Sequence, residues 1–387
     1  MFESRTYDAL VVGARCAGAA TAMLMARAGM RVLVVDRGAY GSDTLSTHAL
    51  MRGGVLQLHR WGVLSRIQRA GTPAIRSTKF HYGSEVIELP IKPAHGCDAL
   101  FAPRRTVLDR ALVDMAQQAG AEIRYGQVLT SLVHDANGRV TGAVLLDGTG
   151  AERSVTAKLV IGADGIGSAV ARLTAAPVMH QASHSTAVIY GHWRGLRATG
   201  YDWYYQPGIG AGVIPTNDGA HCVFVAVPPS RFRDELRHDL NAGYRRVLKD
   251  AAPEVAAEID GAVLETRLWA FAGRRGFLRQ AAGPGWALVG DAGYFKDPLT
   301  AHGLTDALRD AELLAEAAVA GSVRAFAQYA ATRDALSLPL FAVTDAIASF
   351  AWDLDELRAH HHKLNTAMKQ EVEHLAAMSP SAQKRAA

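Results

Sequence analysis

Three short turns of the sequence combine glycines with a charged residue at the end of a β-rich run. They read GARCAG (13–18), GADGIGS (162–168) and GDAGYFKDPLTAHG (290–303). Glycines permit a tight turn and a close approach of phosphate to the N-terminus of a following helix. An aspartate at the end of a strand accepts hydrogen bonds from sugar hydroxyls. Together the three turns predict a binding site for an elongated nucleotide.

The first turn carries an imperfect form of the dinucleotide-binding pattern G-x-G-x-x-G. Gly13 and Gly18 hold the first and third glycine positions, and Arg15 replaces the middle glycine. Asp36 ends the next strand eighteen residues after Gly18, where an acidic residue binds an adenosine ribose. We expect Arg15 to bring positive charge to the phosphates. A packing glycine followed by a surface aspartate is the alternative interpretation.

Two histidines are candidates for proton transfer. His48 follows Ser46 and Thr47 after the second strand, and His302 lies in the bent loop that contains Pro298. An imidazole gains or loses a proton near neutral pH, so either side chain suits acid–base chemistry. A hydrogen-bonded structural histidine is the alternative for both.

Aromatic side chains concentrate between residues 184 and 228. Such side chains suit a flat apolar or aromatic substrate. Burial in the core of a sheet is the alternative for them. The expected substrate wall consists of His192, Trp193, Trp203, Tyr205, Ile214 and Pro215.

The elements that position these residues begin with a strand–helix–strand unit, which is typical of a dinucleotide-binding fold. A strong hairpin turn is expected at Asn137-Gly138. The expected order is strand 9–14, helix 17–29, strand 31–38, helices within 49–70, β-structure with a glycine turn in 77–91, helix 104–120, and three strands in 121–135, 138–146 and 154–164.

An antiparallel sheet is expected in 184–228, then an amphipathic stretch at 230–259, a buried strand near 286–293 and helices to the end. The sequence therefore predicts an α/β protein whose Rossmann-type domain is interrupted by a second, antiparallel-sheet domain. The expected limits are 1–76, 98–177 and 268–340 for the nucleotide-binding domain, 77–97 and 178–267 for the substrate-binding sheet domain, and 341–387 for a C-terminal helical segment.

Composition excludes several other classes of protein. The 387 residues carry a formal net charge of only +4 with scattered basic residues, which argues against nucleic acid as a partner. The three cysteines lack metal-ligand spacing, and the run His360-His361-His362 lies in a polar helical pattern, so we predict no metal site. The sequence shows neither a signal-peptide pattern nor a long apolar run, so we expect a cytoplasmic protein without a membrane partner. The oligomeric state is left open.

The three turns, in this order and spacing, resemble those of FAD-dependent monooxygenases of the single-component hydroxylase type. The resemblance covers residues 7–335. GARCAG is similar to the pyrophosphate loop of that family, GADGIGS to its Asp-Gly motif, and GDAGYFKDPLTAHGLTDALRDA to its Gly-Asp motif. The fold implied is the one shared by glutathione reductase and p-hydroxybenzoate hydroxylase, with FAD as the cofactor.

The resemblance implies roles for particular residues. Asp36 would hold the adenosine ribose, Arg105 the ribityl-phosphate region and Asp291 the ribityl chain, while Pro298 would pass beside the isoalloxazine ring and take part in catalysis. The helix beginning near Gly303 would point its N-terminus at the ring, where negative charge develops on reduction. The full cofactor-binding set implied is Gly13, Arg15, Ala17, Gly18, Asp36, Arg37, Ser46, Thr47, Arg105, Val128, Asp164, Gly165, Asp291, Pro298, Ala301, Gly303 and Leu304.

The resemblance also implies an activity. A hydroxylase of this type binds NAD(P)H transiently, reacts with O2 through a C4a-hydroperoxyflavin and oxygenates a small aromatic or polyketide-like substrate. Ala301, His302 and Thr305 depart from the commonest residues of the family, and F-x-D-P at 295–298 is closer to prenyl reductases and flavin-dependent halogenases. A flavin-dependent double-bond reductase and a halogenase are therefore the alternative enzymes. An FAD-fold escort protein is the alternative outside enzymology.

Overall fold

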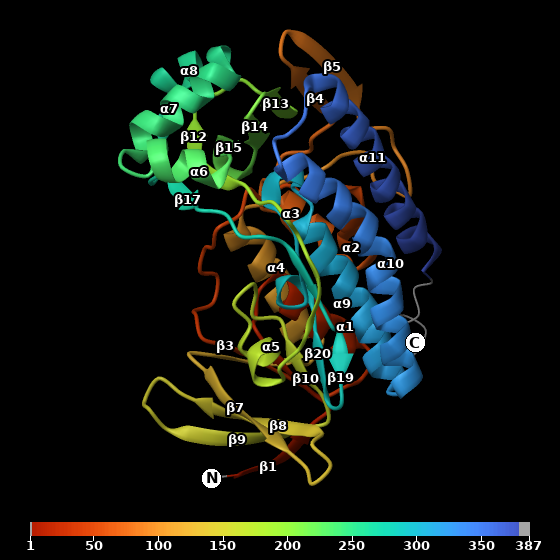
Figure 1. Cartoon of the computed structure of the whole chain (residues 1–387). Helices are drawn as coiled ribbons and strands as arrows, with labels where there is room; N and C mark the ends of the chain where they lie inside the picture. The colour runs from red at the N-terminus through yellow and green to blue at the C-terminus, as the bar shows by residue number, and fades with distance from the viewer. Residues whose placement is uncertain (1, 379–387) are drawn as a thin grey trace.

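The computed structural model describes residues 2–378 and is built around a sheet that is covered on both faces (Figure 1). The order is β19 (Ala282–Gly283), β20 (Trp286–Leu288), β10 (Val160–Gly162), β2 (Ala9–Val12), β3 (Val32–Asp36) and β6 (Glu122–Tyr125). This sheet is parallel except for its edge strand β19, which pairs antiparallel with β20. One face of this six-stranded sheet packs against α1 (Cys16–Arg27), α4 (Arg105–Gln118) and α9 (Gly303–Ala320). The central strands β20, β10, β2 and β3 are almost wholly apolar, as expected for strands buried on both sides, whereas the edge strand β6 carries Glu122 and Arg124.

A four-stranded sheet covers the opposite face of the central sheet. In this part of the chain, two of the three strands expected from the sequence are each divided in two. The run 121–135 is not one strand, because Gly126, with φ 68°, turns the chain out of the parallel sheet after β6. The run 154–164 also divides, into β9 and β10, so five strands form where three were expected. The order of this sheet is β1 (Phe2–Tyr7), β9 (Glu152–Ala157), β8 (Val140–Leu146) and β7 (Val128–His134).

The third large sheet carries the expected second domain. Residues 77–90 join the strands of 187–227, as predicted, although β4 pairs with β13 in parallel. The order is β16 (Val263–Leu264), β12 (Ala187–Arg194), β15 (Ala220–Val227), β14 (Ile209–Pro215), β13 (Tyr201–Gln206), β4 (Ser77–Tyr82) and β5 (Glu85–Pro90), with β17 (Trp269–Phe271) also paired to β12.

The two faces of this sheet have different partners. Ile189 and Trp193 of β12 pack with α7 (Leu240–Ala251) and α8 (Pro253–Asp260) on the outer face. Val188 and Tyr190 belong to the main core on the inner face. The alternation follows from the period of two in a strand, and it decides which side chains of β12 can reach the nucleotide-binding domain.

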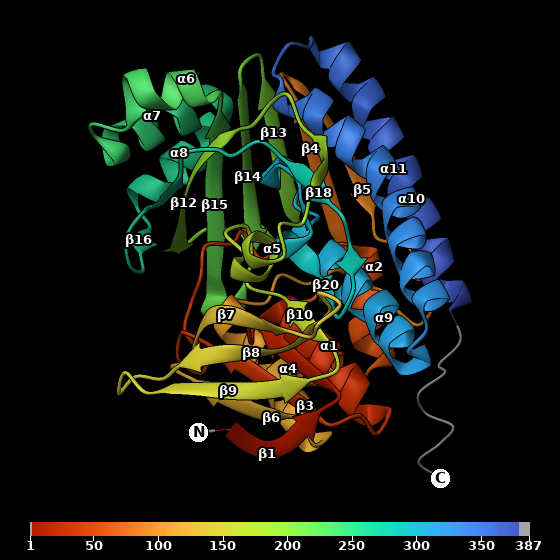
Figure 2. The ribbon, with the colours of Figure 1, turned by 60° about the horizontal axis from the view of Figure 1, so that its bottom comes forward.

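Two long helices run along the side of both domains (Figure 2). They are α10 (Val323–Ala348) and α11 (Leu354–Ala377), and α10 crosses the domain limit expected at 340–341 without a break. Near its start α11 contacts the sheet, where the Tyr82 hydroxyl lies 2.7 Å from His361 Nδ1. Farther along, α11 packs against α2 (Arg52–Arg60). One helix therefore contacts both domains.

Shorter elements complete the described part of the chain. The helices are α3 (Leu64–Arg69), α5 (Ala169–Leu173) and α6 (Pro229–Arg231), with single turns η1 (Asn217–Gly219), η2 (Phe232–Leu236), η3 (Gly290–Ala292) and η4 (Pro298–Thr300). A small sheet joins β11 (Val178–Gln181), β18 (Phe277–Arg279) and β21 (Tyr294–Phe295).

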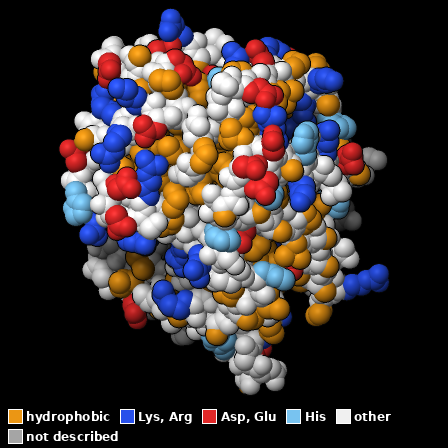
Figure 3. All heavy atoms as spheres, turned by 45° about the horizontal axis from the view of Figure 1, so that its top comes forward, with side chains coloured by type: hydrophobic (Ala, Val, Ile, Leu, Met, Phe, Trp, Pro, Cys, Tyr) orange, Lys and Arg blue, Asp and Glu red, His pale blue; other side chains and the backbone are white. Residues whose placement is uncertain are grey.

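The surface in Figure 3 shows basic and acidic side chains interspersed, with hydrophobic side chains exposed between them. The basic residues thus do not gather into one field on this face. Among residues 2–378, every helix is too short or too polar to pass through a bilayer.

Candidate active site

A cavity of about 760 Å³ lies along the edge where the strands of the parallel sheet end. This edge is where ligands bind in open α/β folds. The turns after β2, β3, β10 and β20 all contribute to its wall, together with α4, β12 and the loop before α9. All predicted cofactor residues except Gly18 line it, and so do His48 and His302. Gly18 lies inside α1, where an added Cβ would be 1.9 Å from the Gly13 carbonyl oxygen.

The phosphate end is formed mainly by backbone. Gly13 has φ 109°, and a Cβ there would lie 2.4 Å from the carbonyl oxygen of Ala163. Within residues 2–378, no side chain caps the N-terminus of α1, and its first turn holds no acid. The Arg15 guanidinium bends toward the Asp43 carbonyl oxygen at 3.3 Å. The N–H groups at the N-terminus of α1 therefore suit an anion despite the missing middle glycine.

The ribose position is held at the end of β3. Asp36 accepts hydrogen bonds from the backbone N–H of Ala14 and of Gly38, each at 2.7 Å. These bonds fix the carboxylate against the first glycine turn, and each oxygen keeps a lone pair for a sugar hydroxyl. Val128 lines the same end of the cavity.

Three charged residues line the middle of the cavity. Arg105 forms a buried ion pair with Asp109 at 2.9 Å. Burial raises the pKa of Asp291 to about 6, which shows how poorly this carboxylate is solvated without a ligand. The Asp164 carboxylate accepts from Ser168 Oγ and the Ala169 N–H, both at 2.6 Å, so its oxygens hold the start of α5. Asp164 thus shapes the turn more than it offers free acceptors.

At the other end, the loop before α9 is tied to the start of β12 in the sheet of the second domain. Asp297 accepts from the Thr186 N–H at 2.6 Å and from Thr186 Oγ1 at 2.7 Å. Ala301 adopts a left-handed conformation with φ 50°, which turns the chain from Pro298 into α9. A Cβ on Gly303 would meet no described atom within 4 Å, so the helix N-terminus opens on the cavity.

His48 contacts a histidine of the other domain. Its Nε2 lies 2.8 Å from Nε2 of His192, and the two rings stack with centroids 5.0 Å apart. Burial, and then the other cationic groups nearby, lowers both pKa values, that of His192 to about 4. Both imidazoles are therefore neutral, and the Nε2–H of one ring donates a hydrogen bond to Nε2 of the other across the domain contact. The sequence predicted roles for each residue but not their pairing.

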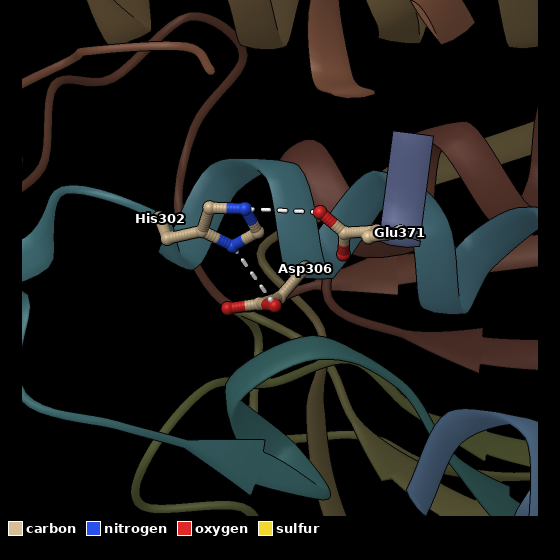
Figure 4. Close-up of side chains that lie close together, drawn as sticks. All are labelled: His302, Asp306 and Glu371. Atoms are coloured by element: carbon tan, nitrogen blue, oxygen red, sulfur yellow. Dashed lines mark hydrogen bonds and ion pairs between the residues drawn. The ribbon is translucent and has the colours of Figure 1, made fainter. Parts of the chain in front are cut away.

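A cluster of buried charges surrounds His302 (Figure 4). His302 Nδ1 lies 3.1 Å from Asp306 Oδ1, and His302 Nε2 lies 2.9 Å from Glu371 Oε2, with poor alignment for a hydrogen bond. His302, Asp306 and Glu371 lie close enough together to hold a metal ion. Lys296 and Arg309 contact the two carboxylates, so these groups already have cationic partners within the protein.

The predicted substrate wall lies elsewhere in the sheet. Trp193 stacks on Tyr244 on the outer face. Trp203 donates to Thr78 Oγ1 at 2.9 Å, and Tyr205 stacks on Tyr82. His192, Ile214 and Pro215 are buried in the sheet. The cavity wall at this end is instead formed by Val188, Tyr190, Phe271 and Phe295.

This elongated cavity fits a flavin dinucleotide. The open N-terminus of α1 suits a pyrophosphate, Asp36 a ribose, and the N-terminus of α9 the electron-accepting edge of a flavin ring. The fold and the cavity together define a flavoprotein.

Comparisons with known proteins agree with this class. The family model described as FAD binding domain matches residues 6–333. The chain belongs to this family and is an FAD-dependent oxidoreductase, so the escort alternative is set aside.

Its curated relatives include two reductases. The chain is 30% identical over 342 residues to a menaquinone reductase of Mycolicibacterium smegmatis, covering 82% of this chain and 77% of that protein. It is 28% identical over 352 residues to a digeranylgeranylglycerophospholipid reductase of Methanocella arvoryzae, covering 86% and 84%.

Solved structures of other flavoenzymes share the fold. The flavin-dependent brominase Bmp2 matches with a TM-score of 0.80 at 20% identity, over 96% of this chain and 93% of that one. PqsL of Pseudomonas aeruginosa, described as a probable FAD-dependent monooxygenase, matches with a TM-score of 0.73 at 19% identity, over 94% and 100%. At such identities the likeness shows the fold alone.

Proposed function

We propose that this oxidoreductase reduces a carbon–carbon double bond in an apolar small molecule, with isoprenoid chains of a quinone or lipid as the substrate class. The observation that carries the proposal is the similarity, over more than four-fifths of the chain, to a menaquinone reductase and an isoprenoid-lipid reductase. This moves the reductase, an alternative from the sequence, ahead of the monooxygenase.

The cavity supports this chemistry. Bound FAD, once reduced, would supply a hydride to one carbon, and the second carbon would then need a proton. An alkene has no exchangeable proton of its own, so a protein group or a water held by one must provide it. Val188, Phe271 and Phe295 would hold the chain and exclude water, while Lys296 and His302 carry protons at the same end.

The lining of the cavity supports an assignment of the residues that would hold FAD. Asp36 would accept from the adenosine ribose, Arg105 would face the central phosphates, and Asp291 would accept from the ribityl chain. The loop from Pro298 to Leu304 would lie beside the ring. The buried carboxylate of Asp291 would gain hydrogen bonds from the ribityl hydroxyls, which would offset the cost of its burial.

A monooxygenase that uses NAD(P)H and O2 is the second candidate. The aromatic wall of Tyr190, Phe271 and Phe295 suits a flat substrate, and this observation favours it. In that case the substrate is a small aromatic or polyketide-like molecule. The nicotinamide would bind transiently in either case.

An anaerobic single turnover separates the two candidates. The purified holoprotein is reduced with dithionite, freed of excess reagent and mixed with a menaquinone of short isoprenoid chain. A reductase oxidises its flavin without O2, and the product keeps two extra hydrogens after the quinone ring is reoxidised in air. A product that forms only in air and gains one oxygen would overturn the reductase proposal in favour of the monooxygenase.

A further inference from the structure

Two residues of the cavity wall, Lys296 and His302, belong to one buried ionic cluster. Lys296 Nζ lies 3.3 Å from His302 Nδ1 and also contacts Asp306 Oδ2. The side chains of Lys296 and His302 are 2% and 1% exposed, so water does not screen them. Any charge that changes in the cavity therefore acts on this cluster at low dielectric.

The contacts of His302 allow two arrangements of its ring protons. Carboxylates approach both ring nitrogens, Asp306 at Nδ1 and Glu371 at Nε2. A neutral imidazole has only one N–H, so it cannot donate to both. If His302 is neutral, its Nε2–H faces Glu371 and Nδ1 accepts from a charged Lys296. If His302 is charged, it faces both carboxylates and Lys296 is neutral. Both arrangements contain the same number of protons.

The net charge of the cluster allows it to accept one more proton. Asp306, Asp310 and Glu371 supply three negative charges. Arg309 supplies one positive charge, and either Lys296 or His302, whichever of the two is protonated to the charged form, supplies a second. A second proton, with both Lys296 and His302 charged, would make the cluster neutral. From the neighbouring elements, Asp291 of η3 adds negative charge, while the Tyr294 ring lies 5.1 Å from Lys296 Nζ and Ser337 of α10 accepts from Arg309.

The acid–base balance agrees with the geometry. Burial, and then Arg309, lowers the pKa of Lys296 to about 7. Burial also lowers the pKa of His302, and Glu371 partly offsets this effect. Burial opposes the charge of Glu371, yet His302 and Arg309 bring its pKa down to about 2. Glu371 therefore remains ionised at neutral pH while Lys296 stands near its point of half-protonation.

We propose that Lys296 and His302 form a proton-exchanging pair that takes up one proton from solvent when the flavin in this cavity is reduced, and that Glu371 of α11 holds that proton in the cluster. A flavin that accepts two electrons and one proton gains one negative charge, and the extra proton on the pair cancels it. The proposal depends on FAD binding and on no particular substrate.

The role of Glu371 explains why α11 is part of the site. Glu371 is fully buried, 2.9 Å from His302 and 2.8 Å from Arg309, although it lies outside the matched family segment of residues 6–333. Glu371 contacts His302 of the pair and does not line the cavity wall. We therefore assign it a positioning role.

The test measures how the flavin midpoint potential of the holoprotein changes with pH, with redox dyes and without substrate. Between about pH 7 and 9 the wild type should take up about one more proton per two electrons than Lys296→Met. Lys158→Met is the matched control, because Lys158 lies on the surface in an ion pair with Asp8 and should leave the proton number unchanged.

Glu371→Gln keeps the shape of the side chain and removes its charge. The pH range of extra proton uptake should then move to lower pH, because the added proton loses its nearest anion. This variant also tests the proposal if Lys296→Met fails to retain FAD. Equal proton numbers in the wild type and these variants across the range would overturn the proposal, whatever the substrate assay shows.

Discussion

The two ends of the cavity bind through different parts of the chain. At the nucleotide end the wall is mostly backbone, with Gly13, the first turn of α1 and the hydrogen-bonded Asp36. At the end expected to hold the flavin ring, the ring end, it is side chains, with Lys296, His302 and His48, whose partner His192 lies outside the wall. The first end has the backbone groups that dinucleotide phosphates need, whereas the second brings titratable and apolar side chains together.

This difference teaches where a substitution should abolish binding and where it should change only chemistry. A backbone-lined site tolerates no added atom, because the chain itself must move. A side-chain cluster tolerates a change of charge if its shape is kept. Predictions that separate the two ends test the comparison directly.

Gly13→Val should give the largest effect. The new side chain would begin 2.4 Å from the Ala163 carbonyl oxygen, at a φ of 109° that disfavours any residue with a Cβ. We expect a loss of more than about 100-fold in FAD affinity, measured by fluorescence titration of the apoprotein. Gly148→Ala is the control, since an added Cβ there meets no described atom within 4 Å. Full retention of FAD by Gly13→Val would show that this turn does not bind the phosphates.

Asp291→Asn should weaken FAD binding by about 10-fold to 100-fold, because a charged acceptor for the ribityl hydroxyls is lost. The apoprotein should become more stable instead. The pKa of Asp291 rises to about 6 on folding, so ionising it costs the native state stability as pH increases from about 4 to 6. At pH 8 the gain is at most about 3 kcal/mol, and it should vanish near pH 4. Urea denaturation of both apoproteins at the two pH values measures it.

The nucleotide end was largely predictable from the sequence. The α/β class, the interrupted domain and the convergence of three turns all followed from local patterns. A glycine at a fixed distance after a strand has few structural meanings, and Gly13, Asp36 and Asp291, selected from such patterns, all line the cavity. The division of 121–135 into two strands was missed, because Gly126 alone did not show which sheet the chain would join.

The ring end was much less predictable. His48 and His302 were selected by residue type, but their partners His192 and Glu371 come from β12 and α11, far away in sequence. Trp193 and His192 are neighbours in the chain and face opposite sides of the sheet, and composition does not reveal which side faces the cavity. Lys296 lies inside the F-x-D-P motif at 295–298. A lysine among residues that are buried was the feature of the sequence that could have marked it as a functional residue.

His192→Phe should act on stability and spare the nucleotide end. The change leaves His48 Nε2 buried without its partner, which costs about 1–3 kcal/mol in the free energy of unfolding. FAD affinity should change less than about threefold, since His192 lies outside the cavity wall. His238→Phe, at an exposed position, is the control for the same side-chain exchange. A large loss of FAD would show that the pair supports the nucleotide directly.

The smallest effects should distinguish the two aromatic groups of the sheet. Phe271 lines the cavity, whereas Trp203 is buried away from it with its Nε1 on Thr78. Phe271→Leu should change the ligand-induced shift of the flavin spectrum, with a loss of about threefold to tenfold in affinity for an apolar ligand. Trp203→Phe should leave that affinity unchanged and lower the free energy of unfolding by about 1–2 kcal/mol, because a hydrogen bond is lost. If Trp203→Phe lowers the affinity for the ligand and Phe271→Leu does not, the substrate binds against the sheet residues that the sequence predicted as the substrate wall.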